Sequence, residues 1–190
     1  MKMLWIMSLL ILSFTTPALS SDNLCLNSDE GFKFDPLTID NVDCSYYLHR
    51  EIDQTCGPSG YYVDFGYKFC SKFMFAKRHW LDFSPKAYTW LTNVGLCLQK
   101  QLHQERCESL AADKESLSCK AVESYAMKSH PECYLMPDIN RPHISICNLA
   151  PTDYLVLTKV IKKTFLKKSI WSQMRLTIKG CGARIFKYLN

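Results

Sequence analysis

The chain of 190 residues contains none of the short motifs that mark common catalytic or nucleotide-binding sites. It has no P-loop, no G-x-G-x-x-G turn and no G-x-S-x-G nucleophile elbow. None of its histidines belongs to an H-x-x-x-H pair, so a helical zinc-hydrolase site is not indicated. We therefore expect a protein that is not an enzyme and has no cofactor. The isolated histidines are expected at the surface or at helix ends; they are His49, His79, His103, His130 and His143.

The sequence also has no close pair of cysteines. No two are nearer than Cys97 and Cys107, whereas structural zinc sites use short C-x-x-C-type pairs, so a metal site is not indicated. The chain nevertheless has 10 cysteines, an even number that indicates a disulfide framework in an oxidising compartment. Spacing alone leaves their pairing open. They are Cys25, Cys44, Cys56, Cys70, Cys97, Cys107, Cys119, Cys133, Cys147 and Cys181.

Only one long apolar run occurs, and it lies at the N-terminus. Lys2 precedes an apolar stretch that ends near Phe14, and Ala18 and Ser20 supply the small residues that signal peptidase requires. The run is shorter than the roughly 20 residues that span a bilayer. We therefore predict a signal peptide over residues 1–20 and a secreted, extracellular domain that begins at residue 21 and ends at residue 190. No N-x-S/T sequon occurs, so N-glycosylation is not expected.

One similarity to an enzyme class fails on its mechanism. Residues 56–60, Cys-Gly-Pro-Ser-Gly, together with Tyr46 and Tyr47 are faintly similar to the calcium loop of secreted phospholipases A2. Those enzymes use a histidine that activates water beside an aspartate that holds calcium, and this chain has no His-Asp pair. Without a general base next to the metal, the hydrolytic mechanism is not supported.

The apolar residues follow helical spacing, and no convincing strand-like alternation occurs. Phe65, Phe69 and Phe73 recur every four residues, which predicts a core-facing helix over residues 62–77. Residues 21–60 are rich in turn-forming residues and predict loops. We therefore expect an all-α, disulfide-stapled domain of about four to five helices with an irregular N-terminal segment.

The helix predicted over residues 85–103 has a clear start. Ser84 is a suitable cap, and Pro85 fits the first helical position, where its missing N–H has no partner to lose. Phe83 before the cap is expected to pack on Tyr88 as a hydrophobic staple.

The later helices are predicted from stop signals. One or two helices are expected over residues 105–128, and Pro131 closes them. The last long helix is expected over residues 151–171. A shorter helical pattern of apolar residues follows it, and the glycines of Gly180-Cys181-Gly182 are expected to end that pattern.

The C-terminal part of the chain is strongly basic. Between Thr152 and Asn190, nine lysines and arginines are accompanied by one acid, Asp153, and they alternate with apolar residues such as Phe165 and Trp171. Such a segment suits a sulfated glycan, an anionic lipid or an acidic protein, and a solvated helix face is the structural alternative. A net charge of only +5 on a secreted chain does not indicate a nucleic-acid partner. The candidate binding residues are Lys159, Lys162, Lys163, Lys167, Lys168 and Arg175.

From Tyr67 to Cys181, the order of cysteines and helices resembles the stanniocalcins, a family of secreted helical glycoprotein hormones. Residues 67–73, Tyr-Lys-Phe-Cys-Ser-Lys-Phe, are similar to the family's Tyr…Cys-Lys-Ser-Phe helix. Residues 132–134, Glu-Cys-Tyr, match the end of a family helix bounded by cysteines. Residues 145–150, Ser-Ile-Cys-Asn-Leu-Ala, resemble the family's Val-Cys-Ser-Ile-Ala.

The resemblance implies a disulfide connectivity. The implied pairs are Cys44–Cys70, Cys56–Cys119, Cys97–Cys133 and Cys147–Cys181, with Cys25 and Cys107 left to pair with each other. The chain departs from the family at Cys107, which lies in an insertion, and in its lack of an odd cysteine. A homodimer is therefore compatible with the sequence, but a disulfide-linked one is not indicated.

The resemblance further implies a non-catalytic signalling or regulatory protein that binds a receptor or another extracellular protein. The family is associated with calcium and phosphate balance and with inhibition of pappalysin metalloproteinases. The alternative follows from charge and not from the resemblance. It is a secreted lipid- or glycan-binding module that uses the basic amphipathic C-terminal segment.

Overall fold

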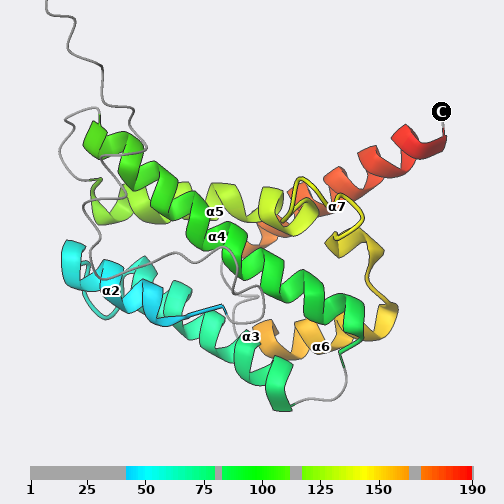
Figure 1. Cartoon of the computed structure of the whole chain (residues 1–190), viewed down its shortest axis with the longest axis horizontal. Coiled ribbons are helices and arrows are strands. Elements are labelled where there is room, and N and C mark those ends of the chain that lie inside the picture. Colours follow the sequence, from blue (N-terminus) through cyan, green and yellow to red (C-terminus); the bar gives the residue numbers. More distant parts are fainter. Residues whose placement is uncertain (1–41, 80–82, 112–116, 163–167, 190) are drawn as a thin grey trace, which may run out of the picture.

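The computed structural model describes residues 42–79, 83–111, 117–162 and 168–189 (Figure 1). Within these ranges the chain is mostly helical and contains no strand, so the predicted all-α fold is confirmed. The described part has six α-helices, one or two more than expected. The elements are α2 (Ser45–Gln54), the π-helix η1 (Tyr61–Tyr67), α3 (Lys68–His79), α4 (Pro85–Ala111), α5 (Cys119–Leu135), the 3-10 helix η2 (Ile146–Asn148), α6 (Pro151–Ile161) and α7 (Lys168–Leu189). The predicted signal peptide lies outside the described residues.

The start of α4 follows its sequence signals. The hydroxyl of Ser84 accepts a hydrogen bond from the N–H of Ala87 at 3.2 Å, and Pro85 is the first helical residue. The rings of Phe83 and Tyr88 meet edge to face with their centroids 6.5 Å apart. The predicted cap and staple are therefore both confirmed, and they fix the direction in which α4 leaves the loop.

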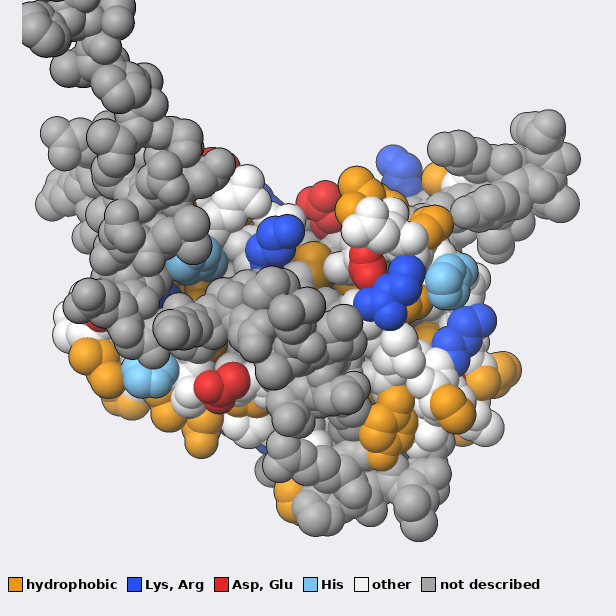
Figure 2. Space-filling model, in the orientation of Figure 1, with side chains coloured by type: hydrophobic (Ala, Val, Ile, Leu, Met, Phe, Trp, Pro, Cys, Tyr) orange, Lys and Arg blue, Asp and Glu red, His pale blue; other side chains and the backbone are white. Residues whose placement is uncertain are grey.

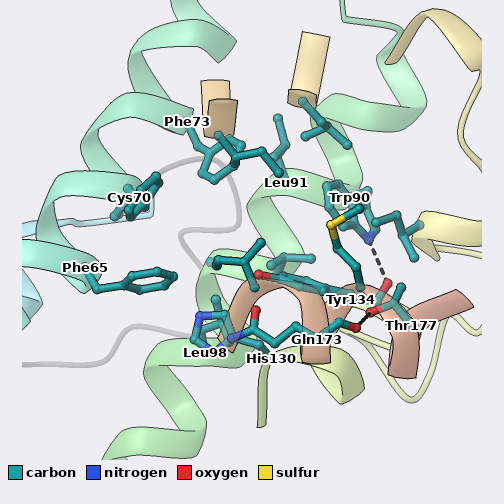
Figure 3. Close-up of a pocket in the computed structure, with 18 of the residues that line it drawn as sticks. Phe65, Cys70, Phe73, Trp90, Leu91, Leu98, His130, Tyr134, Gln173 and Thr177 are labelled. Atoms are coloured by element: carbon teal, nitrogen blue, oxygen red, sulfur yellow. Dashed lines mark hydrogen bonds between the residues drawn. The ribbon is translucent and has the colours of Figure 1, made fainter. Parts of the chain in front are cut away.

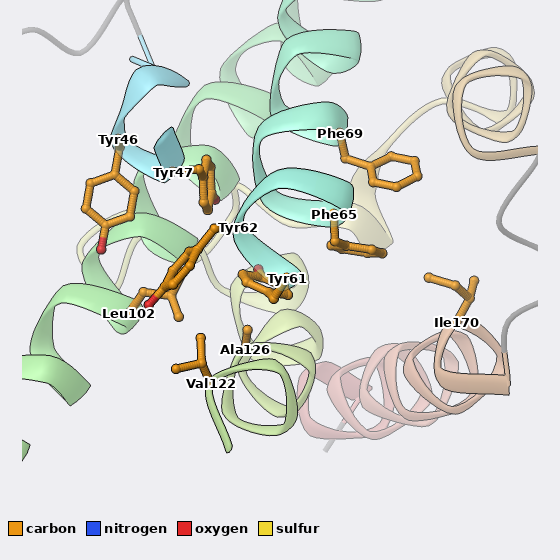
Figure 4. Close-up of a cluster of buried hydrophobic side chains, with 10 residues drawn as sticks. All are labelled: Tyr46, Tyr47, Tyr61, Tyr62, Phe65, Phe69, Leu102, Val122, Ala126 and Ile170. Atoms are coloured by element: carbon orange, nitrogen blue, oxygen red, sulfur yellow. The ribbon is translucent and has the colours of Figure 1, made fainter. Parts of the chain in front are cut away.

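Two clusters of buried side chains hold the helices together. The first, shown in Figure 4, packs aromatic side chains of α2 and η1 against α4, α5 and α7. The second joins α3, α4 and α6 with the loop that precedes α6. Phe73 packs against both clusters, and Phe65 and Phe69 are buried in the first, so the predicted aromatic stripe is core. The first cluster consists of Tyr46, Tyr47, Tyr61, Tyr62, Phe65, Phe69, Leu102, Val122, Ala126 and Ile170.

Four disulfide bonds cross-link the described helices. They tie the start of α2 to α3, the turn before η1 to the start of α5, α4 to α5, and η2 to α7. The four bonds are those that the resemblance implies: Cys44–Cys70, Cys56–Cys119, Cys97–Cys133 and Cys147–Cys181. Cys107 is also disulfide-bonded. Its implied partner, Cys25, lies outside the described residues.

The prediction of loops throughout residues 21–60 is wrong for the part that forms α2. Tyr46, Tyr47 and Arg50 share one face of this helix, and all three are buried. Before the helix, Asp43 accepts hydrogen bonds from the backbone N–H of Ser45 at 2.9 Å and from its hydroxyl at 2.8 Å. The burial of two aromatic rings therefore outweighs the weak helix propensity of this polar segment.

α5 passes through Pro131, which was predicted to close it. The carbonyl of Ala126, one turn earlier, accepts hydrogen bonds from the hydroxyl of Ser129 at 2.9 Å and from Nδ1 of His130. Cys133 beyond the proline is bonded to α4. These side-chain donors and the cross-link stabilise the turn around the proline, where the helix lacks one backbone hydrogen bond.

α7 continues through Gly180-Cys181-Gly182, which was predicted to end a helix. Gly180 lies where α7 meets α5, and a Cβ atom there would be 2.3 Å from Cδ1 of Leu135. Gly182 faces open space. The first glycine therefore allows two helices to approach closely and does not break α7.

Two further boundaries differ from the predictions. The residues expected to form one long helix over 151–171 belong in part to α6, which ends at Ile161, and in part to α7, which begins at Lys168, and residues 163–167 lie outside the described ranges. α4 extends beyond its predicted end at His103 to Ala111, and neither glycine nor proline occurs in that extension to stop it. None of the described helices combines the length and apolar character needed to cross a lipid bilayer.

Candidate functional site

A cavity of about 500 Å³ lies where the described helices meet. Every helix from α2 to α7 contributes to its wall, as do η1 and η2. Figure 3 shows the side chains that surround this space, and most of them are aromatic or aliphatic. The labelled residues are Phe65, Cys70 and Phe73 from η1 and α3, Trp90, Leu91 and Leu98 from α4, His130 and Tyr134 from α5, and Gln173 and Thr177 from α7.

Three polar side chains on the cavity wall donate hydrogen bonds within the protein. The hydroxyl of Thr177 donates to the carbonyl of Gln173 at 2.8 Å, and Nε2 of Gln173 donates to the sulfur of Met127 at 2.9 Å. Nε1 of Trp90 donates to the carbonyl of Tyr134 at 3.0 Å, which ties α4 to α5 beside the cavity (Figure 3). The wall therefore offers a ligand inside it mainly apolar contact.

The titratable side chains on the wall are uncharged at neutral pH. Burial raises the pKa of the phenols of Tyr47, Tyr61 and Tyr134 well above the ordinary value, so all three stay protonated. Burial also lowers the pKa of His130 to about 4, opposed by its hydrogen bond to the carbonyl of Ala126. The interior of the cavity is thus neutral as well as apolar.

His130 is not at the surface or at a helix end, where the sequence analysis expected isolated histidines. It lies inside α5 and is 2% exposed. Its ring makes edge contacts with Phe65 at 5.5 Å and with Tyr134 at 5.7 Å between ring centroids. The neutral imidazole therefore acts as an aromatic packing group that also satisfies a backbone carbonyl near Pro131.

The part of the cavity wall that reaches the surface is contributed by α6 and α7, and we call it the mouth. Among the residues that line the cavity, three have exposed side chains: Tyr154 and Thr158 on α6 and Ile178 on α7. Lys162 follows Thr158 by four residues, and Arg175 precedes Ile178 by three, so each cation is a helical neighbour of a mouth residue. Both cations are exposed. The apolar cavity therefore opens next to positive charge.

The structure places the predicted basic residues in different settings. Lys159, Lys162 and Arg175 are exposed, and none of them forms an ion pair within the described part of the chain. Lys163 and Lys167 lie outside the described residues, and Lys168 is the first residue of α7. The described cations thus lie on α6, at its C-terminal end and on α7, two helices that both line one cavity.

The described surface does not carry charge of one sign. Figure 2 shows one face, on which acidic and basic side chains both occur and hydrophobic side chains are exposed between them. The most exposed large apolar residues include Leu155 on α6 and Ile178 on α7. A purely electrostatic partner surface is therefore less well supported on this face than a mixed apolar and basic one.

The cavity itself was not predicted from the sequence. Its wall combines residues from η1 to α7 that share no spacing in the sequence, such as Phe65, Trp90 and Gln173. No motif could have indicated this arrangement, since apolar positions with helical spacing predict a filled core equally well. Within the described ranges, no group of three or more His, Cys, Asp and Glu side chains is placed to hold a metal ion.

Comparison with known proteins identifies no relative of this chain. No protein-family model, no curated protein and no solved structure matches it significantly.

Proposed function

We propose that the chain is a secreted, non-catalytic signalling or regulatory protein of the stanniocalcin type, which acts by binding a receptor or another extracellular protein. The observation that carries this proposal is the disulfide connectivity. Eight cysteines can pair in roughly a hundred ways. The four bonds among described cysteines are the four that the stanniocalcin resemblance implies, from Cys44–Cys70 to Cys147–Cys181.

Secretion is supported by two independent features. The predicted signal peptide directs the chain to an oxidising compartment, where disulfide bonds form and persist. The described cysteines are all bonded, as that environment requires. A cytosolic protein with the same framework would be exposed to thiol reductants that oppose it.

The exposed faces of α6 and α7 are the surface that best suits a protein partner. Leu155 is 65% exposed and Trp171 is 55% exposed. Each is followed four residues later by an exposed cation, Lys159 and Arg175 respectively, which places apolar and basic side chains together on each helix. Aromatic residues and arginine are the side chains most enriched in the energetically important parts of protein interfaces.

The experiment that tests this proposal is a binding assay with the mature, disulfide-bonded protein and cells and extracellular fluid from its own source. We expect saturable binding that unlabelled protein displaces. A variant with Leu155→Ala, Trp171→Ala and Arg175→Ala should bind at least about tenfold more weakly, since removing a single interface anchor often costs about 2 kcal/mol. Absence of any saturable, displaceable binding by the unaltered protein would refute the proposal.

The matched control changes two apolar residues and one cation elsewhere on the surface. Ile52→Ala, Ile139→Ala and Lys86→Ala alter residues that are exposed on α2, on the loop after α5 and on α4. This variant should bind like the unaltered protein. Equal weakening by both variants would show that binding does not depend on the faces of α6 and α7.

The second candidate function is binding of a sulfated glycan or an anionic lipid surface through the same C-terminal helices. It is favoured by the exposure of Lys159, Lys162 and Arg175. Retention on heparin should then fall with salt, because exposed charges are screened. It should also fall in the variant Lys159→Glu, Lys162→Glu but not in the control Lys86→Glu, Lys100→Glu. Equal retention of the two variants would remove this candidate.

A further inference from the structure

The central cavity is too large and too apolar to be a packing defect. Protein interiors are packed like organic crystals and leave few voids larger than a water molecule. A space of about 500 Å³ falls in the size range of small-molecule sites, which are lined mostly by aromatic and aliphatic side chains. Phe65, Trp90 and Leu91 are such side chains on this wall, and all three are buried.

The interior of the cavity disfavours a charged ligand group. His130 and Tyr134 are neutral at physiological pH, and the amide and hydroxyl groups of Gln173 and Thr177 already donate hydrogen bonds within the protein. A charged group placed among them would lose its hydration without a partner of opposite charge. A ligand in the depth of the cavity should therefore be uncharged, and the mainly apolar wall favours a hydrocarbon group.

The mouth has the opposite character. Thr158 and Ile178 form exposed parts of the rim, and Lys162 and Arg175 lie one helical turn from them. Both cations are exposed, so their long side chains are able to turn toward a ligand at the rim. An anionic group there would remain partly hydrated and would be attracted by the positive charge of these two side chains.

We propose that this cavity binds one molecule of a free long-chain fatty acid, with the hydrocarbon chain inside the cavity and the carboxylate at the mouth beside Lys162 and Arg175. The inference goes beyond the proposed regulatory function and does not rest on it, because the hydrocarbon chain is placed inside the helical domain, although Arg175 at the rim also belongs to the proposed partner surface. A fatty acid has one hydrocarbon chain and one terminal carboxylate. These two parts fit a cavity with a neutral, apolar interior and basic side chains at its rim.

Calorimetric titration of the mature, disulfide-bonded protein with monomeric fatty acids tests the proposal. We expect one site per chain. Each added methylene between the ten- and sixteen-carbon acids should tighten binding by about fourfold until the cavity is filled, because burial of each methylene is favourable by the corresponding amount. Binding that does not depend on chain length would overturn the proposal.

Two variants test the position of the hydrocarbon chain. Thr158→Trp places a large ring at the mouth, and Leu98→Phe adds volume to the wall contributed by α4. Both should weaken fatty-acid binding at least about tenfold, since an added ring competes with the ligand for the same space. Because Thr158 is exposed, its replacement leaves the core intact, and circular dichroism should show an unchanged helical signal. Full binding by a folded Thr158→Trp protein would overturn the proposal.

The variant Lys162→Glu, Arg175→Glu tests the position of the carboxylate. It should bind a fatty acid about tenfold more weakly and the alcohol of the same chain length as well as the unaltered protein does. The control variant Lys86→Glu, Lys100→Glu, with the same change in net charge, should bind both ligands normally. Equal affinities of all three proteins for the acid would overturn the assignment, as would binding to anionic vesicles without binding of any monomeric fatty acid.

Discussion

Asp153 and Ser84, 69 positions apart in the sequence, are joined by two hydrogen bonds of 2.8 Å. One carboxylate oxygen of Asp153 accepts from the backbone N–H of Ser84, and the other accepts from its hydroxyl. The second oxygen also accepts from the N–H of Ala150 at 3.0 Å, at the start of α6. One fully buried carboxylate therefore organises the N-termini of α4 and α6, two helices that line the cavity.

Replacement of Asp153 by alanine should lower the free energy of unfolding by about 3 kcal/mol, because it leaves three partly buried donors without their acceptor. The measurement is denaturant unfolding with the disulfide bonds intact. Asp64→Ala is the control, since that carboxylate pairs with Lys68 within one helical turn at the surface, and should cost only about 0.5 kcal/mol. Equal effects of the two changes would contradict the role of Asp153.

The two glycines of α7 should respond to alanine in opposite directions. Gly182→Ala should stabilise the protein by about 0.5–1 kcal/mol, because open space surrounds the position and alanine favours helix. Gly180→Ala should destabilise it, because the added methyl group would overlap the side chain of Leu135 on α5. Thermal melting of both variants checks the pair, and stabilisation by Gly180→Ala would contradict the close contact between α5 and α7.

His130 should make stability depend on pH between 6.5 and 4. Its pKa falls from 6.5 to about 4 on burial, so in this window the unfolded chain binds a proton that the folded protein does not. The stabilisation is complete above pH 6.5 and is lost as pH falls to about 4, a loss of about 3 kcal/mol from this group.

The variant His130→Phe removes that titration and should flatten the pH dependence of the free energy of unfolding in this window. His143→Gln changes an exposed histidine and should leave the slope as it is. Urea unfolding at several pH values measures both. A slope in His130→Phe equal to that of the unaltered protein would show that His130 is not buried in its neutral form.

The bond Cys147–Cys181 should hold α7 in place beside the cavity and should also stabilise the folded protein. It attaches η2 to α7, and both Ile146 and Cys181 line the cavity. The double variant Cys147→Ser, Cys181→Ser should lose about 2–4 kcal/mol of stability. Hydrogen exchange should also show faster opening of α7 than of α4, which keeps its own bond to α5. Equal hydrogen-exchange protection of α7 in the unaltered protein and in the double variant would contradict this role.

Local signals in the sequence were sufficient for the start of α4 but insufficient for the start of α2 and for the courses of α5 and α7. The Ser84–Pro85 start of α4 could be predicted because a cap and a first-turn proline act through neighbouring residues alone. Pro131 and Gly180 were misread because their effects depend on contacts from elsewhere in the chain. A buried histidine and a disulfide support the turn at Pro131, and the side chain of Leu135 lies against Gly180.

The candidate site was predicted only in part. Charge along the sequence identified Lys162 and Arg175, which are exposed near the mouth of the cavity. The wall behind them could not be predicted, because apolar spacing shows that a helix face is buried but not whether the faces that meet leave a space. The disulfide pairs came from the resemblance, since cysteine spacing in itself leaves connectivity open.

Non-reducing peptide mapping of the protein collected from the medium of expressing cells would show both whether the protein is secreted and how its cysteines are paired. We expect a mature N-terminus at Ser21 and the bonds Cys44–Cys70, Cys56–Cys119, Cys97–Cys133 and Cys147–Cys181. The same digest should yield no free thiol. Retention of the protein inside the cell, or a different set of bonds, would contradict a secreted protein built on the stanniocalcin framework.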